Sequence, residues 1–332
     1  MPKISVIIPG YNHEKFLPKR IESALGQSVH DIEVIILDDA STDDSMSVIK
    51  RYAGDLRVRI IPNQINSGNP FIQWNRGVRE AIGEYVWIAE SDDYADSRFL
   101  EVLASRLDKH PNVGLAYCDS FRVNAEGVLC GVYKDYYRRV DPQHWVADFI
   151  ASGKGEILGY LLDRNSIPNA SGVLFRRAIY ERSGGASTDL RLCGDWLMWI
   201  KMLLISDLAY VAEPMNYFRC HDQNVRTASG DFLLHKEHYQ VLKYVEDHLR
   251  IKSPQMKAVL GRISAAWACS IFDRKSWEKW RHLPDVYRAA CTVDPHPVLR
   301  LVWFLGLHYP WRLREALRSR KKTSPLICTD SH

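Results

Sequence analysis

The first half of the chain alternates between short apolar runs and amphipathic segments. Apolar runs occur at residues 4–9, 33–37, 57–61 and 85–89, and helical periodicity follows at about 14–25, 43–52, 70–82 and 97–110. An apolar run without alternation is typical of a strand buried on both faces, as in a parallel sheet covered by helices. The pattern therefore predicts an α/β fold with a mostly parallel central sheet and right-handed crossovers.

The second half is less regular and ends without strands. Strands are predicted at 113–118, 172–176, 208–212 and 215–218, and helices at 177–183 and 194–204. Residues 120–166 mix aromatic and charged positions with no clear period, and beyond about residue 227 helices are predicted at 232–249, 255–280 and 284–291. We expect a domain over residues 1–226, with halves 1–119 and 120–226, followed by a helical region over 227–332.

Acidic and polar side chains gather where the predicted strands end. The residues that follow the first, second and fourth strands are Pro9, Tyr11 and Asn12, then Asp38 and Asp39, then Glu90, Ser91, Asp92 and Asp93. In open α/β sheets, ligands bind beyond the carboxyl ends of the strands. Carboxylates clustered there suit a hard divalent ion, Mg²⁺ or Mn²⁺, which could hold a diphosphate.

These side chains also have a purely local interpretation. Asn12 could cap the helix over 14–25, and Ser41 with Asp44 resembles a capping box for the helix over 43–52. Asp39 could form an Asx-turn, and the acids between 92 and 96 could cap the helix that begins near residue 97. The chain has no G-x-G-x-x-G after the first strand and no G-x-x-x-x-G-K, so a glycine-rich phosphate loop is not predicted.

Composition narrows the class of protein. The 332 residues are 46% hydrophobic and 25% charged, as in ordinary soluble globular proteins, and the formal net charge of +4 is too small to indicate a nucleic-acid partner. Seven cysteines, with no C-x-x-C pair, do not form a disulfide framework and favour a reducing cytoplasm. We expect no signal peptide, and no apolar run reaches the roughly 18 residues of a membrane-spanning helix.

The order of these signals resembles a known family. A strand followed by PGYN, a strand followed by DDAS, a strand followed by ESDD, then GD-W and finally CH is similar to inverting family 2 glycosyltransferases of GT-A fold, the bacterial cell-surface polysaccharide type. The resemblance covers residues 4–224, roughly two-thirds of the 332 residues. It implies a nucleotide-sugar donor, most simply a UDP- or dTDP-sugar, a glycan or lipid-linked acceptor, and Mn²⁺ or Mg²⁺.

On the nucleotide side, the resemblance implies that residues 1–119 hold the donor. Pro9, Tyr11 and Asn12 would line the nucleoside pocket at the end of the first strand. Asp39 would accept a hydrogen bond from the base, with Asp38 alongside it.

On the reaction side, the resemblance implies that residues 120–226 carry the acceptor and catalytic sites. Glu90 and Asp92, with Ser91 between them, occupy the acid positions of the D-x-D motif, the first facing the ribose and the second the metal. Asp195 matches the general base, and His221 matches a histidine near the diphosphate or metal. One base and one stabiliser of the leaving group are sufficient for direct displacement with inversion.

Three positions depart from the pattern of the family. Glu90 replaces the first aspartate of D-x-D, Gly194 stands where a glutamate usually precedes the catalytic aspartate, and Trp74 stands where many members have arginine. Glu90 and Gly194 leave open a non-catalytic nucleotide-sugar or carbohydrate-binding protein on the same fold. Asp195 could then be only a helix N-cap, and His221 only a partly exposed histidine.

The C-terminal tail has a composition of its own. Residues 298–307 are apolar, and they are followed by a set of basic side chains, Arg312, Arg314, Arg318, Arg320, Lys321 and Lys322. An apolar, tryptophan-containing segment beside a basic helix fits contact with an anionic membrane surface through residues 298–322. The alternative is a terminal helix packed on the core.

We expect a cytoplasmic protein, peripheral at the inner face of the membrane if the tail binds lipid. The sequence leaves open whether the chain forms a homo-oligomer.

Overall fold

The computed structural model describes residues 2–220, 231–271 and 282–305. The chain divides into two compact units, Met1–Ala228 and Ser229–His332, which are considered separately. The first unit contains the sheet and the candidate site. The second is helical in its described residues.

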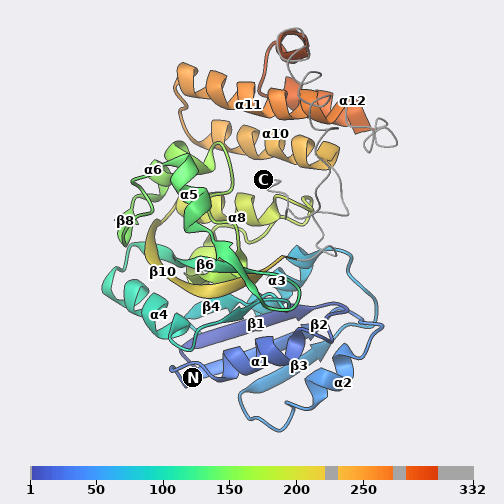
Figure 1. The fold of residues 1–332 in the computed structure, drawn as a ribbon, viewed down its shortest axis with the longest axis vertical. Helices are drawn as coiled ribbons and strands as arrows, with labels where there is room; N and C mark the ends of the chain where they lie inside the picture. The colour runs from blue at the N-terminus through green and yellow to red at the C-terminus, as the bar shows by residue number, and fades with distance from the viewer. Residues whose placement is uncertain (1, 221–230, 272–281, 306–332) are drawn as a thin grey trace. The chain divides into compact units, whose positions relative to one another are not determined.

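The first unit is built on one sheet (Figure 1). Along the sheet its main strands are β3 (Val58–Pro62), β2 (Ile32–Asp38), β1 (Ile4–Gly10), β4 (Tyr85–Ile88), β9 (Val173–Arg176), β6 (Val113–Val123), β10 (Asp207–Arg219) and β5 (Tyr94–Ala95). β7 (Leu129–Val132) pairs with β6, and β8 (Phe149–Ala151) pairs with β10. β3, β2, β1 and β4 are parallel, while β9 is antiparallel to β4 and β6. The predicted mostly parallel α/β sheet is confirmed.

Helices cover both faces of this sheet. They are α1 (Leu17–Leu25), α2 (Ser45–Lys50), α3 (Pro70–Glu80), α4 (Phe99–Lys109), α5 (Lys134–Val140), α6 (Gly153–Glu156), a π-turn at Ile157–Leu161, a 3₁₀ turn at Ala170–Gly172, α7 (Arg177–Arg182) and α8 (Gly194–Leu203). On one face Ile4, Val6 and Ile8 of β1 join the core formed with α1, α2 and α4. On the other face α3 lies so close that a Cβ on Gly77 would be 2.3 Å from Cγ2 of Ile7.

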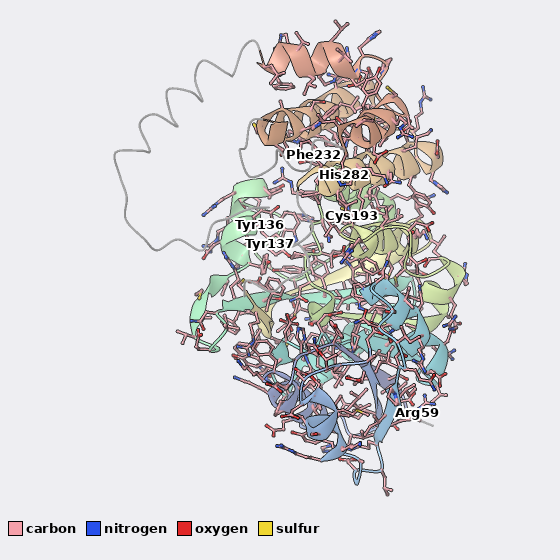
Figure 2. All side chains as sticks on the ribbon, turned by 90° about the vertical axis from the view of Figure 1, so that its right-hand side faces the viewer. Arg59, Tyr136, Tyr137, Cys193, Phe232 and His282 are labelled. Carbon is pink, nitrogen blue, oxygen red and sulfur yellow. The ribbon has the colours of Figure 1, made fainter. Side chains whose placement is uncertain are left out.

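The structure differs from the predicted pattern in the middle of the chain. β10 is one long strand where two were predicted, with register shifts around Pro214, because proline cannot donate to the ladder but the chain continues beyond it. β6 continues to Val123, past the predicted end at residue 118. In the region without periodicity, Tyr137 (labelled in Figure 2) stacks on Trp145 at 4.7 Å, so its aromatics form a local core instead of one helix face.

The second unit contains α10 (Asp231–His248), α11 (Ser253–Ile271), α12 (Leu283–Cys291) and a helix over 297–305. Tyr239, Trp267 and Val286 are buried in it, and the Tyr239 hydroxyl hydrogen-bonds the hydroxyl of Ser264 at 3.1 Å. Among the described residues, no helix is both long and apolar enough to cross a membrane.

Candidate functional site

The candidate site lies where β1, β2 and β4 end. These strands are parallel neighbours, with Gly10 opposite Asp38 and Ile7 opposite Ile88, so their carboxyl ends share one edge of the sheet. The loops beyond them are joined by hydrogen bonds. The backbone N–H of Thr42 donates to Oδ1 of Asn12 at 2.8 Å, and Nδ1 of His13 lies 2.6 Å from the Ser91 hydroxyl. The structure thus brings together the polar loops of all three strands.

The predicted helix caps at this edge are wrong. Phe16 is the N-cap of α1 and Asp44 that of α2, and neither makes a side-chain cap bond. Asn12 instead bonds to the neighbouring loop, and the Ser41 hydroxyl accepts from the backbone N–H of Asn12 at 3.0 Å. Asn12 and Ala40 have φ of 54° and 60°, in the left-handed region that is disfavoured for alanine by roughly 1–2 kcal/mol. The side chains of Asn12 and Ser41 therefore connect the loops after β1 and β2 and do not cap helices.

The two aspartates after β2 have different environments. The carboxylate of Asp39 is buried and accepts from Nδ2 of Asn63, from the N–H and hydroxyl of Ser67, and from Nε2 of Gln73, at 2.5–2.9 Å. Four donors match the capacity of a carboxylate. The alternative of an Asx-turn at Asp39 is wrong, because its carboxylate accepts from these more distant residues; the local contact belongs to Asp38, whose Oδ2 accepts from the N–H of Ser41 at 3.1 Å.

Asp38 also carries an unsatisfied acceptor. Its Oδ1 is buried and has no hydrogen-bond partner among the described residues. Leaving a buried acceptor unpaired costs roughly 1–3 kcal/mol, a cost that a donor on a ligand would remove. At the end of the neighbouring strand β1, Tyr11 is 44% exposed, whereas Pro9 is buried beside Leu37. Asp38 and Tyr11 are thus the side chains best suited to bind a ligand where β1 and β2 end, a part of the site called the nucleotide corner below.

The loop after β4 is fixed by partners from distant parts of the chain. The indole N–H of Trp74 donates to Oε1 of Glu90 at 2.7 Å, and Nε of Arg20 donates to the Glu90 carbonyl at 2.8 Å. The backbone N–H of Glu90 donates to the Ser171 hydroxyl at 3.0 Å. The loop is therefore held at its first acid by a side chain of α3, one of α1 and the 3₁₀ turn.

Asp93 is a structural acid. It is buried, and its carboxylate accepts from the backbone N–H of Arg219 at 2.8 Å and from Nδ2 of Asn169 at 3.2 Å. Nε of Arg219 donates to the carbonyl of Asp92 at 2.7 Å, which ties the loop to the end of β10. Asp93 therefore does not cap α4. Asp96 does take a local role, because its carboxylate accepts from the N–H of Arg98 just before that helix.

The loop after β4 that carries Glu90, Asp92 and Asp93, called the acid loop from here on, has little positive charge beside it to offset its negative charge. Burial, then the charges of Asp92 and Asp93, raise the pKa of Glu90 to about 8. Burial also raises the pKa of Asp93. The cation beneath the loop is Arg20, whose pKa burial lowers to about 10, and whose two terminal nitrogens have no hydrogen-bond partner among the described residues. Two of these three acids have a raised pKa although two buried cations, Arg20 and Arg219, lie beside the loop, so the site favours the arrival of further positive charge.

The donor atoms fit a cation that takes further ligands from a substrate. No group of three or more His, Cys, Asp or Glu side chains in the described residues could hold a metal alone. Mg²⁺ is commonly held by one or two carboxylates together with substrate phosphates. Asp92 and Glu90 are each partly exposed, and they fit that role. His221 lies outside the described residues.

Asp195 lies at the start of α8, in its first turn. The N-cap is Cys193 (labelled in Figure 2), so the interpretation of Asp195 as the cap is wrong. One carboxylate oxygen accepts from Nδ2 of Asn165 at 2.9 Å and the other from the N–H of Trp196 at 2.7 Å. Both donors and the positive end of the helix dipole favour the charged carboxylate. Asp195 is thus an oriented anion at a helix terminus.

Sequence reasoning missed several residues of this site. Arg20 follows Leu17 by three positions and precedes Ile21, so the helical period placed it on the buried face of α1, which was a usable signal. Gln73 likewise sits on the buried face of α3 between Phe71 and Gly77. The hydrogen-bond partners of Arg20 and Gln73 could not be predicted from the sequence. No local sequence pattern marked Asn165 or Arg219 as residues of the site.

Known proteins share this sequence pattern. The model of Glycosyl transferase family 2 matches residues 5–181. Poly(ribitol-phosphate) beta-N-acetylglucosaminyltransferase TarS of Staphylococcus aureus is 31% identical over 137 residues, which are 41% of this chain and 24% of TarS. Chondroitin synthase of Escherichia coli is 35% identical over 130 residues, 39% of this chain and 19% of the synthase. The matched segment is therefore a small part of each of these relatives.

Solved structures share the fold. S. aureus TarS 1–349 in complex with UDP-GlcNAc has a TM-score of 0.66 at 18% identity, covering 99% of this chain and 95% of that one. The mannosyltransferase PcManGT of Pyrobaculum calidifontis, in complex with GDP-Man and Mn²⁺, has a TM-score of 0.56 at 18% identity, covering 96% and 82%. The GT-A fold is thus confirmed, and because the family model matches more than half of the 332 residues, the chain belongs to glycosyl transferase family 2.

Proposed function

We propose that this chain transfers a sugar, with inversion, from a UDP- or dTDP-sugar to a hydroxyl of a glycan or lipid-linked glycan. The observation that carries the proposal is the shared edge of β1, β2 and β4, where an unsatisfied Asp38 oxygen and the acid loop lie on adjoining, hydrogen-bonded loops. Family membership and the sugar transferases among the relatives support it.

The nucleoside would bind between the loops of β1 and β2. Uracil and thymine each carry one ring N–H, which Asp38 Oδ1 would accept, while the exposed Tyr11 ring would pack on the base. Asp39, with its four donors from the chain, would act by holding the loop over 63–69 in place. The neighbouring TarS structure contains UDP-GlcNAc, which supports the choice of a uridine nucleotide.

The diphosphate and the reacting carbon would lie beyond the acid loop. A divalent ion held by Asp92 and Glu90 would offset the negative charge that builds on the leaving diphosphate. Asp195 would accept the proton of the acceptor hydroxyl. At the same time the oxygen of that hydroxyl would bond to the anomeric carbon, and the bond from this carbon to the phosphate oxygen would break. Asn165 would keep the basic oxygen oriented during this step.

Thermal melting with UDP, dTDP, GDP and CDP, each with and without Mn²⁺, tests the proposal. We expect UDP or dTDP with Mn²⁺ to raise the melting temperature by about 5–10 °C, since ligand at 100 times its Kd adds about 2.7 kcal/mol to the folded state. A chain that melts identically under all eight conditions would contradict it. Binding without any release of nucleoside diphosphate from UDP- and dTDP-sugars across a panel of glycan acceptors would favour the non-catalytic binding protein instead.

We also propose a peripheral membrane contact through residues 298–322. In the described part of this segment, Val298, Leu299, Val302 and Trp303 are 50–68% exposed. The adjoining groove of about 710 Å³ is lined by the same helix and by α11, which contributes Lys257 and Arg262. Exposed apolar side chains beside basic ones fit a bilayer with anionic lipid. Such a contact would bring the enzyme to a lipid-linked acceptor.

Vesicle co-sedimentation checks this contact. Replacing Leu299 and Trp303 together by glutamate should weaken binding to vesicles containing phosphatidylserine by at least about tenfold, because two exposed apolar side chains that would insert into the bilayer are replaced by negative charges. The matched control is Leu56→Glu, which changes a fully exposed leucine of the first unit and should leave binding unchanged. Equal sedimentation of all three chains would contradict the contact.

A further inference from the structure

One helix contacts every part of the candidate site. From α3, Gln73 donates to Asp39 and Trp74 donates to Glu90. The N-cap of the same helix, Asn69, donates through Nδ2 to the carbonyls of residues 188 and 190, in the loop that leads to α8. The nucleotide corner, the acid loop and the approach to Asp195 are therefore all held by residues 69–74.

The contact between Trp74 and Glu90 has a particular chemistry. Both are partly or wholly buried, and the indole nitrogen lies 2.7 Å from Oε1. An indole N–H is a neutral donor, so it fixes the direction of the Glu90 side chain without placing a positive charge beside it. Among the described residues no donor is found for Oε2, which stays available to a ligand.

The contact between Phe71 and Gly194 is steric. A Cβ on Gly194 would lie 2.3 Å from Cε2 of the Phe71 ring and within 2.6 Å of two more ring atoms. Real side chains do not approach so closely, so residue 194 must be glycine while the buried ring occupies this position. The ring thus rests on the first residue of α8, immediately before Asp195.

The two aromatic residues also touch each other. The rings of Phe71 and Trp74 are edge to face, with centroids 5.0 Å apart. A continuous series of contacts therefore runs from Glu90 through Trp74 and Phe71 to Gly194 and the start of α8. Trp74, Glu90 and Gly194, the three positions noted in the sequence as departures from the pattern of the resembled family, all belong to this one series.

We propose that Phe71 and Trp74 form a positioning pair that sets the donor side of the site, at Glu90, relative to the acceptor side, at Asp195. The inference rests on the proposed function. Neither aromatic residue is a catalytic residue. Trp74 acts by orienting the Glu90 carboxylate, and Phe71 acts by fixing the backbone from which Asp195 projects.

The donor arm is tested by a double-mutant cycle on the Kd for UDP in the presence of Mn²⁺, measured by calorimetry. Trp74→Phe keeps an aromatic ring but removes the N–H donor together with part of the buried indole, and we expect it to weaken binding at least about tenfold, as for the loss of a hydrogen bond to a charged group. In a Glu90→Met chain, where residue 90 has no oxygen to accept from the indole, the same change should alter the Kd less than about twofold. Equal losses in both backgrounds, or no loss in either, would overturn the inference.

The acceptor arm is tested by rescue. Gly194→Ala should lower the rate of UDP release from the donor, measured with acceptor present, by at least about tenfold with little change in the Kd for UDP, because it displaces the helix that carries Asp195. Phe71→Leu in the same chain makes room for the new methyl group and should restore most of the rate. A purely structural role would lower the melting temperature of Gly194→Ala without this loss of rate, and that result would overturn the inference.

The failure of the proposed function is distinguishable from the failure of this inference. A wild-type chain that binds no nucleotide would contradict both. A wild-type chain that binds UDP with Mn²⁺ while Trp74→Phe binds equally well would contradict the positioning pair alone. Melting temperatures of every variant identify chains that have failed to fold, and Trp74→His, which retains an N–H donor, provides the conservative rescue expected to bind better than Trp74→Phe.

Discussion

Asp195→Asn is expected to lower the rate of sugar transfer by about 10²–10⁴-fold, the range for loss of a positioned general base. Asparagine has nearly the same shape, and its oxygen can still accept from the N–H of Trp196, so the start of α8 should be preserved, although its NH2 group would face Nδ2 of Asn165 and that one hydrogen bond would be lost. It cannot take a proton from the acceptor hydroxyl. The Kd for UDP with Mn²⁺ should stay within about twofold of wild type, because Asp195 makes no contact with the nucleotide in the proposed reaction.

Asp189→Asn is the matched control for this substitution. Asp189 is an exposed acid six positions earlier, in the loop that leads to α8, and its replacement should leave both rate and Kd unchanged. Asn165→Ala should give an intermediate loss, about tenfold, because it removes one donor that orients the base but leaves the base itself. Transfer at the wild-type rate by Asp195→Asn would remove Asp195 as the base while leaving the nucleotide site intact.

The fold could be predicted because its strands are marked locally. Runs such as residues 4–9 and 33–37 are apolar at all but one position each, Ser5 and Glu33, as burial on both faces of a covered parallel sheet requires. Two strands were predicted at 208–212 and 215–218, whereas the chain forms one strand that continues past Pro214 with a change of register. Residues 120–166 could not be predicted, since their aromatics pack against one another rather than along one helix face.

The candidate site could be predicted only in part. The position of the acids followed from the rule that parallel strands end at one edge, and that prediction needed no knowledge of their partners. The hydrogen bonds that distinguish Asp38 from Asp39, or that join Trp74 to Glu90, connect residues whose proximity only the folded chain creates. In the sequence, Gly194 was interpreted as the loss of the glutamate that usually precedes the catalytic aspartate in the resembled family. In the structure it is the space that the Phe71 ring requires.

The second large effect is expected for Asp92→Asn. Asp92 is, like Glu90, a partly exposed acid of the loop, whereas Asp93 beside it is buried and accepts hydrogen bonds from Arg219 and Asn169. Replacing an ionic ligand by a neutral amide should weaken the binding of UDP with Mn²⁺ at least about 100-fold, since losing even an outer partner of a metal ligand costs 10–100-fold. The melting temperature without ligand should not fall, because one negative charge leaves an acid-rich loop.

Asp93→Asn is the informative control, because the neighbouring acid should behave in the opposite way. Its amide would face Nδ2 of Asn169, donor against donor in a buried site, so the melting temperature without ligand should fall. Mn²⁺ titrations followed by electron paramagnetic resonance in the presence of UDP would separate the two variants. If Asp92→Asn still bound Mn²⁺ and UDP like the wild type, the metal could not rest on Asp92. Retention by Asp92→Asn together with loss by a stably folded Asp93→Asn would place it on the inner acid, and the hydrogen bonds from Arg219 and Asn169 would then have to break when the ion binds.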